Sequence, residues 1–280
     1  MNILAPAKIN LFLHVTGKKP DRYHDLFSLM CCVSLYDTVT LNFDAADISV
    51  VCSHPDVPED ETNLAWRAAH KFLSQTQTDA GIEIILEKKI PVAAGLGGGS
   101  SDAAAVLSGL NSYYGQPLSH EKLSALGLTI GADVPFFIFR KPAIAEGVGE
   151  KLKRFHRIKP LPVLLVYPEI HVSTTSVYDN FNLGLTKCKQ RLKKHFFDNE
   201  HSFDMIQCLY NDLETVTMHR HSEVRKAQKA LIRYGAGGAL MSGSGPTVFG
   251  LFDNNAKAES AKKELLTNSR WQVFHVEMLV

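Results

Sequence analysis

The chain has 280 residues, of which 45% are apolar and 21% charged, and its formal net charge is +1. This composition is typical of a globular protein with one large or two ordinary domains, and it gives no electrostatic reason to expect binding to nucleic acid or to a membrane. The five cysteines are an odd number without a C-x-x-C pair, which argues against a disulfide framework or a structural zinc site. We therefore expect a cytoplasmic protein.

The first predicted element is a strand over residues 7–15, where apolar and polar residues alternate. Its polar face carries Lys8 and Asn10, so one face of the strand suits a core and the other suits a site. Lys8 is the best candidate for a cation in that site, and a solvated lysine at a sheet edge is the alternative. Further strands are predicted over 26–35, 38–43 and 47–52, and an amphipathic helix over 62–74 that begins at Thr62 or Asn63.

A glycine-rich loop follows a short strand at 82–86 and occupies residues 91–105. Gly95, Gly97, Gly98 and Gly99 fall within five positions and allow the backbone to approach a ligand closely. Ser100, Ser101 and Asp102 are good N-cap residues, so we expect a helix over 101–114. A glycine loop that opens a helix directs free N–H groups and the positive end of the helix dipole to one point, which favours a bound phosphate.

Two well-known phosphate loops do not fit this spacing. A Walker A loop needs a lysine that is absent between Pro91 and Leu110. The dinucleotide-binding pattern begins correctly at Gly95 but has Ser100 where its third glycine belongs. A flexible linker is also disfavoured, because a well-capped apolar helix follows at once. The sequence therefore predicts a phosphate loop of a third kind.

Asp133 is the best candidate for a carboxylate that assists phosphoryl transfer. It lies after a second predicted helix, at 119–127, where residues 131–140 are expected to turn into an aromatic strand. An aspartate that only caps a turn is the alternative reading.

Basic residues interrupt the apolar pattern near 150–160 and predict two domains, 1–157 and 158–280. The second half is predicted to contain strands at 163–167, 239–241, 247–252 and 271–279, and helices at 173–181, 187–216, 223–234 and 256–267. The segment 187–195 is basic, which suits a solvated helix face. A second glycine turn, Ser242-Gly-Ser-Gly-Pro246, lies between two of the strands. The β-α-β-β-α-β order indicates a ferredoxin-like module.

Five segments together resemble the GHMP kinase superfamily. They are residues 5–13 (Ala-Pro-Ala-Lys-Ile-Asn-Leu-Phe-Leu), 21–26 (Asp-Arg-Tyr-His-Asp-Leu), 91–105, 131–136 (Gly-Ala-Asp-Val-Pro-Phe) and 242–246. The first two are similar to the branch that acts on 4-diphosphocytidyl-2-C-methyl-D-erythritol. That branch usually has glycine where Arg22 stands, so we expect this loop to turn differently here.

The resemblance implies an α+β fold of two domains, one like domain 2 of ribosomal protein S5 and the second ferredoxin-like. It also implies that ATP, with Mg²⁺, donates its γ-phosphate to the 2-hydroxyl of the cytidyl diphosphate substrate. This reaction belongs to the methylerythritol phosphate route to isoprenoids. A GHMP kinase acting on mevalonate, homoserine or a sugar is the alternative, and a nucleotide-binding regulator without catalysis is a third reading. The oligomeric state stays open between monomer and homodimer.

The resemblance also implies roles for individual residues. Lys8 and Asp133 match the catalytic pair. The substrate-binding positions match Asn10, Tyr23, His24 and Tyr178. The ATP-binding positions match Asn63, Leu64, Pro91, Gly95, Leu96, Gly97, Gly98, Gly99, Ser100 and Ser101. No side chain is assigned to the metal, although Ser100 or Ser101 could reach it.

Overall fold

The computed structural model describes residues 1–20, 23–181 and 203–280, so Arg22 and the basic segment 187–195 lie outside the described residues. The chain forms two compact units. Unit 1 comprises residues 1–7, 35–92 and 97–140, and unit 2 comprises residues 8–34, 93–96 and 141–280. Two of the boundaries between them fall within the long strands β1 (Asn2–Lys18) and β2 (His24–Asn42), and two more fall within the glycine loop. The domain boundary expected at residue 157 falls inside unit 2 and stays a prediction.

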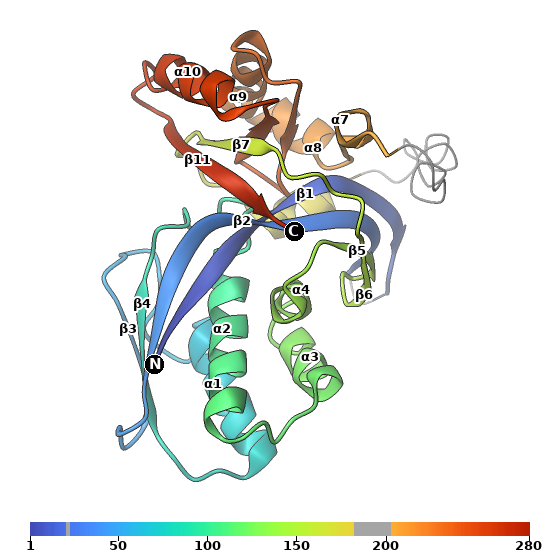
Figure 1. Ribbon diagram of the computed structural model, residues 1–280. Coiled ribbons are helices and arrows are strands. Elements are labelled where there is room, and N and C mark those ends of the chain that lie inside the picture. Colours follow the sequence, from blue (N-terminus) through green and yellow to red (C-terminus); the bar gives the residue numbers. More distant parts are fainter. Residues whose placement is uncertain (21–22, 182–202) are drawn as a thin grey trace. The chain divides into compact units, whose positions relative to one another are not determined.

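Unit 1 combines a sheet with four helices. Strand β4 (Ile82–Glu87) pairs in parallel with β3 (Ile48–Cys52) and antiparallel with the second half of β2. The helices are α1 (Leu64–Thr76), α2 (Gly98–Tyr113), α3 (His120–Leu128) and α4 (Val134–Phe139). Figure 1 shows α1 and α2 side by side, with α3 and α4 next to α2. The helices predicted at 62–74, 101–114 and 119–127 are confirmed, with small shifts at their ends.

Helix α1 begins where the sequence predicts. Asn63 is its N-cap residue, and its side-chain oxygen accepts a hydrogen bond of 2.8 Å from the backbone N–H of Ala65. The Asn63 amide also donates to the carbonyl of Pro58 at 2.6 Å. Apolar residues at helical spacing, Phe72 among them, then bury one face of the helix.

One predicted element in this half is wrong, and two predicted strands are joined into one. Residues 134–139 form α4 rather than an aromatic strand. Pro135 favours the first turn of a helix, and periodicity cannot separate a strand from a helix in so short an apolar run. The strands expected at 26–35 and 38–43 are one continuous strand, β2.

Unit 2 is built on a four-stranded antiparallel sheet in the order β9–β10–β7–β11. These strands are β7 (Pro162–Tyr167), β9 (Gly238–Met241), β10 (Val248–Leu251) and β11 (Gln272–Leu279). Helices α9 (Ser222–Arg233) and α10 (Asn255–Leu265) pack next to each other on this sheet (Figure 1). This order is that of a ferredoxin-like module, as the sequence predicts. The strands and helices expected beyond residue 222 are confirmed.

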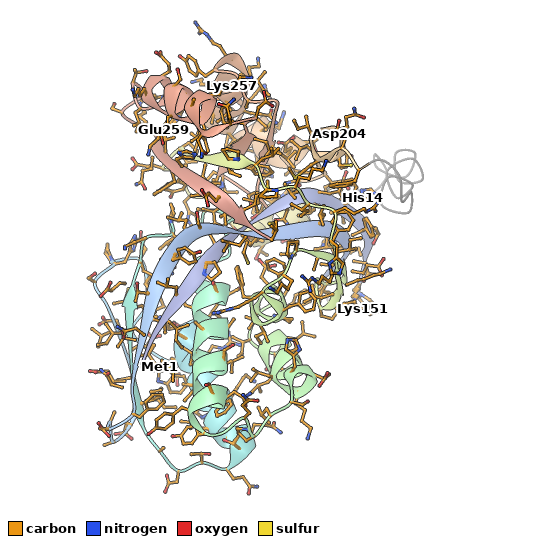
Figure 2. All side chains as sticks on the ribbon, viewed as in Figure 1. Met1, His14, Lys151, Asp204, Lys257 and Glu259 are labelled. Carbon is orange, nitrogen blue, oxygen red and sulfur yellow. The ribbon has the colours of Figure 1, made fainter. Side chains whose placement is uncertain are left out.

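Other elements of unit 2 pair along β1 and β2. Strands β5 (Ala143–Gly147) and β6 (Lys151–Arg154) continue from the first half of β2, and β8 (Tyr210–Asn211) pairs in parallel with β1. Short helices are α5 (Thr174–Asp179), α7 (Met205–Cys208) and α8 (Glu214–Arg220). Charged residues such as Lys257 and Glu259 lie on α10 (Figure 2). None of the described helices is both long and apolar enough to cross a membrane.

Candidate functional site

The glycine loop turns into α2 at Gly97, which has left-handed backbone angles (φ 75°) and is the N-cap residue. The helix therefore begins at Gly98, earlier than predicted, and no side chain caps it. Gly98 and Gly99 fill the first turn, where backbone N–H groups have no partner within the helix and the helix dipole is positive. The loop therefore presents N–H donors next to residues without side chains, an arrangement that suits a phosphate group.

Asp102, expected to cap α2, instead belongs to an ionic cluster of Lys88, Asp37 and Asp102. Lys88 Nζ bonds to the carboxylates of both aspartates, and all three side chains are buried. Asp37 also accepts hydrogen bonds from the two backbone N–H groups of residues 89–90. A Cβ atom on Gly98 would lie 3.3 Å from Lys88 Nζ and from Asp37 Oδ2, so a larger residue would crowd the cluster. The helix thus starts on a buried ion pair and not on a side-chain cap.

Burial changes the acidity of this ionic cluster. It raises the pKa of Asp102 to about 7, an effect that Lys88 opposes and Asp37 increases. Burial lowers the pKa of Lys88, but the two carboxylates outweigh it, so the pKa is raised overall. The ammonium is therefore retained across ordinary pH, and the cluster serves to fix the start of α2.

Two further predicted segments of unit 1 lie at the start of α2. A Cβ atom on Gly99 would lie 3.6 Å from Leu64 Cδ1, and one on Gly131 would lie 3.5 Å from Ser100 Oγ. Asp133, two residues beyond Gly131, is half-buried and occupies the N-cap position of α4 without making a capping hydrogen bond. The side chain of Asp133 therefore does not cap α4, and its catalytic role stays a prediction.

In unit 2, Lys8 and Asn10 lie on β1 in a chain of hydrogen bonds. Lys8 Nζ donates to Asn10 Oδ1 at 2.7 Å, and Asn10 Nδ2 donates to Ser28 Oγ at 2.9 Å. The backbone N–H of Lys8 donates to the carbonyl of Leu96 at 2.9 Å, which ties β1 to the end of the glycine loop. Lys8 is only 4% exposed and Asn10 3%, so Lys8 is not the solvated edge lysine of the alternative reading.

The second glycine turn, residues 242–246, packs against Gly95, in the part of the glycine loop that belongs to unit 2. Ser242 Oγ donates to the carbonyl of Gly95 at 3.0 Å. A Cβ atom on Gly95 would lie 2.3 Å from the Ser242 carbonyl oxygen, and one on Gly243 would lie 3.2 Å from Lys8 Nζ. Both glycines are therefore required by close backbone approach. The turn contacts two residues of the predicted site, Gly95 and Lys8.

Sequence reasoning missed the side chains that hold this turn, which are Asn211, Glu214 and Thr217. They lie in a segment predicted only as part of a long helix, and their partners are distant in sequence. The one available signal is their spacing of three residues, which places polar side chains on a single helical face.

His24 and Tyr178, both predicted to bind substrate, lie in contact in unit 2. Their ring centroids are 5.1 Å apart, with an angle of 31° between the rings. His24 is 6% exposed, whereas Tyr23 beside it is 57% exposed. Burial lowers the pKa of His24, Lys18 adds to this, and Asp179 opposes it. A neutral imidazole has one donor and one acceptor, which suits the polar edge of a nucleobase.

The predicted residues are divided between the two units. Unit 1 contains Asn63, Leu64, Pro91, Gly97, Gly98, Gly99, Ser100, Ser101 and Asp133. Unit 2 contains Lys8, Asn10, Tyr23, His24, Gly95, Leu96 and Tyr178. Each unit by itself therefore brings together several predicted segments.

Two family models match the sequence. The model of the GHMP kinases N terminal domain matches residues 63–141, and that of the GHMP kinases C terminal matches residues 193–269. The chain is 46% identical to the 4-diphosphocytidyl-2-C-methyl-D-erythritol kinase of Syntrophotalea carbinolica, over 99% of this chain and 98% of the relative. It is 44% identical to the kinase of the same name from Geobacter metallireducens, over 100% of this chain and 99% of the relative.

Solved structures agree with the fold. The crystal structure of a 4-(cytidine 5'-diphospho)-2C-methyl-D-erythritol kinase superposes with a TM-score of 0.81 at 33% identity, over 100% of both chains. A homoserine kinase from Cytophaga hutchinsonii superposes with a TM-score of 0.79 at 18% identity, over 100% of this chain and 94% of that one, and so shows only a shared fold.

Proposed function

This chain belongs to the GHMP kinases and, within them, to the 4-diphosphocytidyl-2-C-methyl-D-erythritol kinases, and we propose that it phosphorylates the 2-hydroxyl of that cytidyl substrate with ATP. The observation that carries this function is the 46% identity to a kinase of that name over 99% of the chain. Shared glycine loops alone would give only short stretches of similarity. The reaction belongs to the non-mevalonate route to isoprenoid precursors.

ATP is the phosphoryl donor, and we place its phosphates at the start of α2. What supports this is the left-handed Gly97 and the first turn formed by Gly98 and Gly99, which leave N–H donors accessible. Leu64 beside Gly99 supports the proposal that Asn63 and Leu64 contact the adenosine part.

Mg²⁺ fits the same place as a partner of the phosphates. Among the described residues, no group of three His, Cys, Asp or Glu side chains could hold a metal ion alone. A kinase site needs no such group, because Mg²⁺ keeps several waters and binds substrate phosphates with one or two protein ligands. Ser100 Oγ is half-buried beside Gly131, and Ser101 Oγ is buried without a hydrogen-bond partner among the described residues. Either hydroxyl could supply one oxygen to an ion that neutralises charge on the phosphates.

For the transfer itself we assign separate roles to Asp133 and Lys8. The substrate 2-hydroxyl oxygen attacks the γ-phosphorus, a new O–P bond forms, and the bond to the β,γ-bridging oxygen breaks to release ADP. Asp133 orients the hydroxyl and accepts its proton, and Lys8 stabilises the developing negative charge. The buried, hydrogen-bonded position of Lys8 supports a fixed rather than a solvated cation.

For the acceptor we propose a cytidyl pocket that contains Asn10, Tyr23, His24 and Tyr178. The contact between the rings of His24 and Tyr178 supports it, because a cytosine ring can stack on one aromatic face while its polar edge meets the imidazole. The lowered pKa of His24 supports a neutral partner. The substrates are small molecules, and we propose that the enzyme works in a reducing cytoplasm, because its five cysteines include no C-x-x-C pair.

The deciding experiment is a coupled assay of ADP release with and without the cytidyl substrate. We expect release that depends on this substrate and a single phosphorylated product by phosphorus NMR. The alternative, a GHMP kinase acting on mevalonate, homoserine or a sugar, predicts turnover with one of those compounds. It also predicts no inhibition by millimolar CMP or CDP, because those acceptors carry no nucleobase.

The role of Asp133 is tested by Asp133→Asn. Loss of a general base lowers kcat by about 10²–10⁴-fold. A folded variant with near-normal kcat would exclude this role for Asp133 while leaving the identity of the substrate intact.

A further inference from the structure

The glycine turn 242–246 depends on partners from outside its own strands. All five of its residues are buried, so its backbone polar groups must find hydrogen bonds within the protein. Gly243 and Gly245 have positive φ angles of 56° and 84°, which turn the chain away from the β9–β10 ladder. Several of the required bonds are made by side chains of one segment, residues 211–217.

Asn211 donates two hydrogen bonds to the turn and to the end of β9, and it accepts a third from its own segment. Its Nδ2 donates to the carbonyls of Met241 at 2.8 Å and Gly243 at 2.7 Å, and its Oδ1 accepts from the backbone N–H of Leu213 at 2.9 Å. The residue is only 3% exposed. Both hydrogens of the Asn211 amide group therefore bond to carbonyls at the two ends of one bend in the chain. The amide oxygen is fixed in turn by the backbone N–H of Leu213.

Two neighbours on α8 complete the contact. Glu214 Oε1 accepts from the backbone N–H of Met241 at 2.9 Å, and Thr217 Oγ1 donates to the carbonyl of Ser244 at 3.1 Å. We call Asn211, Glu214 and Thr217 the turn clamp. Its three side chains fix four backbone groups between residues 241 and 244.

The turn clamp is attached to β1, the strand that also carries Lys8. Asn211 pairs with Leu13 across the β8–β1 ladder. Next to it, the backbone N–H of Asp212 donates to the Leu13 carbonyl at 3.0 Å, and the Asp212 carboxylate bonds to His14. Figure 2 labels His14 on β1. The turn clamp is therefore bonded to the strand that carries Lys8.

We propose that Asn211 is a positioning residue for phosphoryl transfer, acting through the glycine turn on Gly95 and Lys8. The turn is close to both: Ser242 Oγ bonds to the Gly95 carbonyl, and a Cβ atom on Gly243 would lie 3.2 Å from Lys8 Nζ. A shift of the turn must therefore displace the end of the phosphate loop or the lysine. This role rests on the proposed kinase function, because the positions of Gly95 and Lys8 affect the rate only if the protein catalyses phosphoryl transfer.

The first test replaces Asn211 and compares it with a matched asparagine. Asn211→Asp keeps the size but sets a carboxylate oxygen against two carbonyl oxygens. We expect kcat to fall about 10²-fold, the effect of misplacing reacting groups by about 1 Å. The control is Asn111→Asp in unit 1, where Asn111 makes a similar pair of 3.0 Å bonds with the backbone of Leu118. We expect this control to lose stability but to keep kcat within about threefold.

Thr217 provides a second pair of variants in case Asn211→Asp does not fold. Thr217→Val removes the hydroxyl that bonds to Ser244 in a site with no exposed surface, and we expect kcat about tenfold lower, since one lost bond shifts the turn less. Thr217→Ser keeps the hydroxyl and should restore kcat. A purely structural role would lower the melting temperature of both Thr217→Val and Asn211→Asp without lowering kcat of the folded protein, and that result would overturn the proposal.

Amide hydrogen exchange over residues 93–96 separates this proposal from the proposed function, because it needs no acceptor substrate. We expect faster exchange there in Asn211→Asp and unchanged exchange in Asn111→Asp. If the wild type fails to phosphorylate the cytidyl substrate but exchange responds in this way, the proposed function fails while the coupling of Asn211 to residues 93–96 stands. Unchanged exchange in folded Asn211→Asp would overturn the positioning.

Discussion

Two buried polar networks support the two glycine segments, and they use different chemistry. In unit 1, the ionic cluster holds the start of α2 with one ammonium and two carboxylates. In unit 2, the segments around Gly95 and Lys8 are held by hydrogen bonds to backbone carbonyls and between neutral groups, such as those from Asn211 and Ser242. A charge network fails when one member is removed, because the remaining charges are left buried. A network of neutral bonds loses one bond at a time.

Because of this difference, we expect substitutions in the two networks to affect different properties of the protein. The ionic cluster fixes the first turn of a helix, so a substitution in it should mainly lower the free energy of unfolding. The neutral network lies next to Lys8, so small displacements of its residues should mainly lower kcat.

The largest expected effect is on stability. Lys88→Met leaves the carboxylates of Asp37 and Asp102 buried without their cation, and we expect the free energy of unfolding to fall by about 3–5 kcal/mol. Urea denaturation measures this loss. The matched control is Lys226→Met, which removes a lysine from the exposed pair with Glu223 and should change stability by less than about 1 kcal/mol. A similarly small loss for Lys88→Met would show that the cluster does not stabilise α2.

Lys8→Met should have the opposite effect from Lys88→Met, lowering kcat and not stability. Methionine keeps most of the buried volume, so we expect the melting temperature to change little, while kcat falls about 10²–10³-fold through loss of charge stabilisation. Steady-state assays on the folded variant measure this. If kcat stayed within tenfold of the wild type while stability fell sharply, Lys8 would belong with Lys88 as a structural lysine.

Helices and strands in which apolar residues recur at regular spacing could be predicted from the sequence. Hydrogen bonds and ion pairs between side chains far apart in the chain could not. The N-cap of α1 at Asn63 and the strand face with Lys8 follow from local pattern and side-chain chemistry. Local pattern predicts Ser100, Ser101 and Asp102 as caps of α2, but Gly97 is the N-cap residue and Asp102 bonds instead to Lys88, a partner that local pattern does not reveal. Asn211 was missed for the same reason, since its partners lie 30 and 32 residues away.

Glu214 adds an ionisable group to the otherwise neutral turn clamp, and its titration sharpens the comparison. Burial raises the pKa of Glu214 to about 7, which its bond from Met241 opposes. Because this pKa lies above the unfolded value, the stability associated with the group is present below about pH 4.5 and is lost as pH rises to about 7.

Glu214→Gln keeps the acceptor oxygen and removes this titration. As pH rises from 5 to 8, we expect the free energy of unfolding of the variant to increase relative to that of the wild type by up to about 3 kcal/mol. The measurement is the difference between the two free energies at each pH. The difference cancels the contribution of Asp102, which titrates in the same range in both proteins. A pH-independent difference would mean that Glu214 stays ionised in the folded protein.

The smallest expected effect concerns α1, which starts on a neutral cap where α2 starts on the ionic cluster. Asn63→Ala removes the bonds to Ala65 and Pro58 and should lower stability by about 1 kcal/mol. Asn63→Asp keeps the capping oxygen and should recover most of it. Since both polar ends of the side chain are used inside the protein, the proposed contact with ATP must come from the backbone of 63–64. The KM for ATP should then rise in Asn63→Ala and return in Asn63→Asp; a KM raised equally in both would instead indicate that the Asn63 amide itself binds the nucleotide.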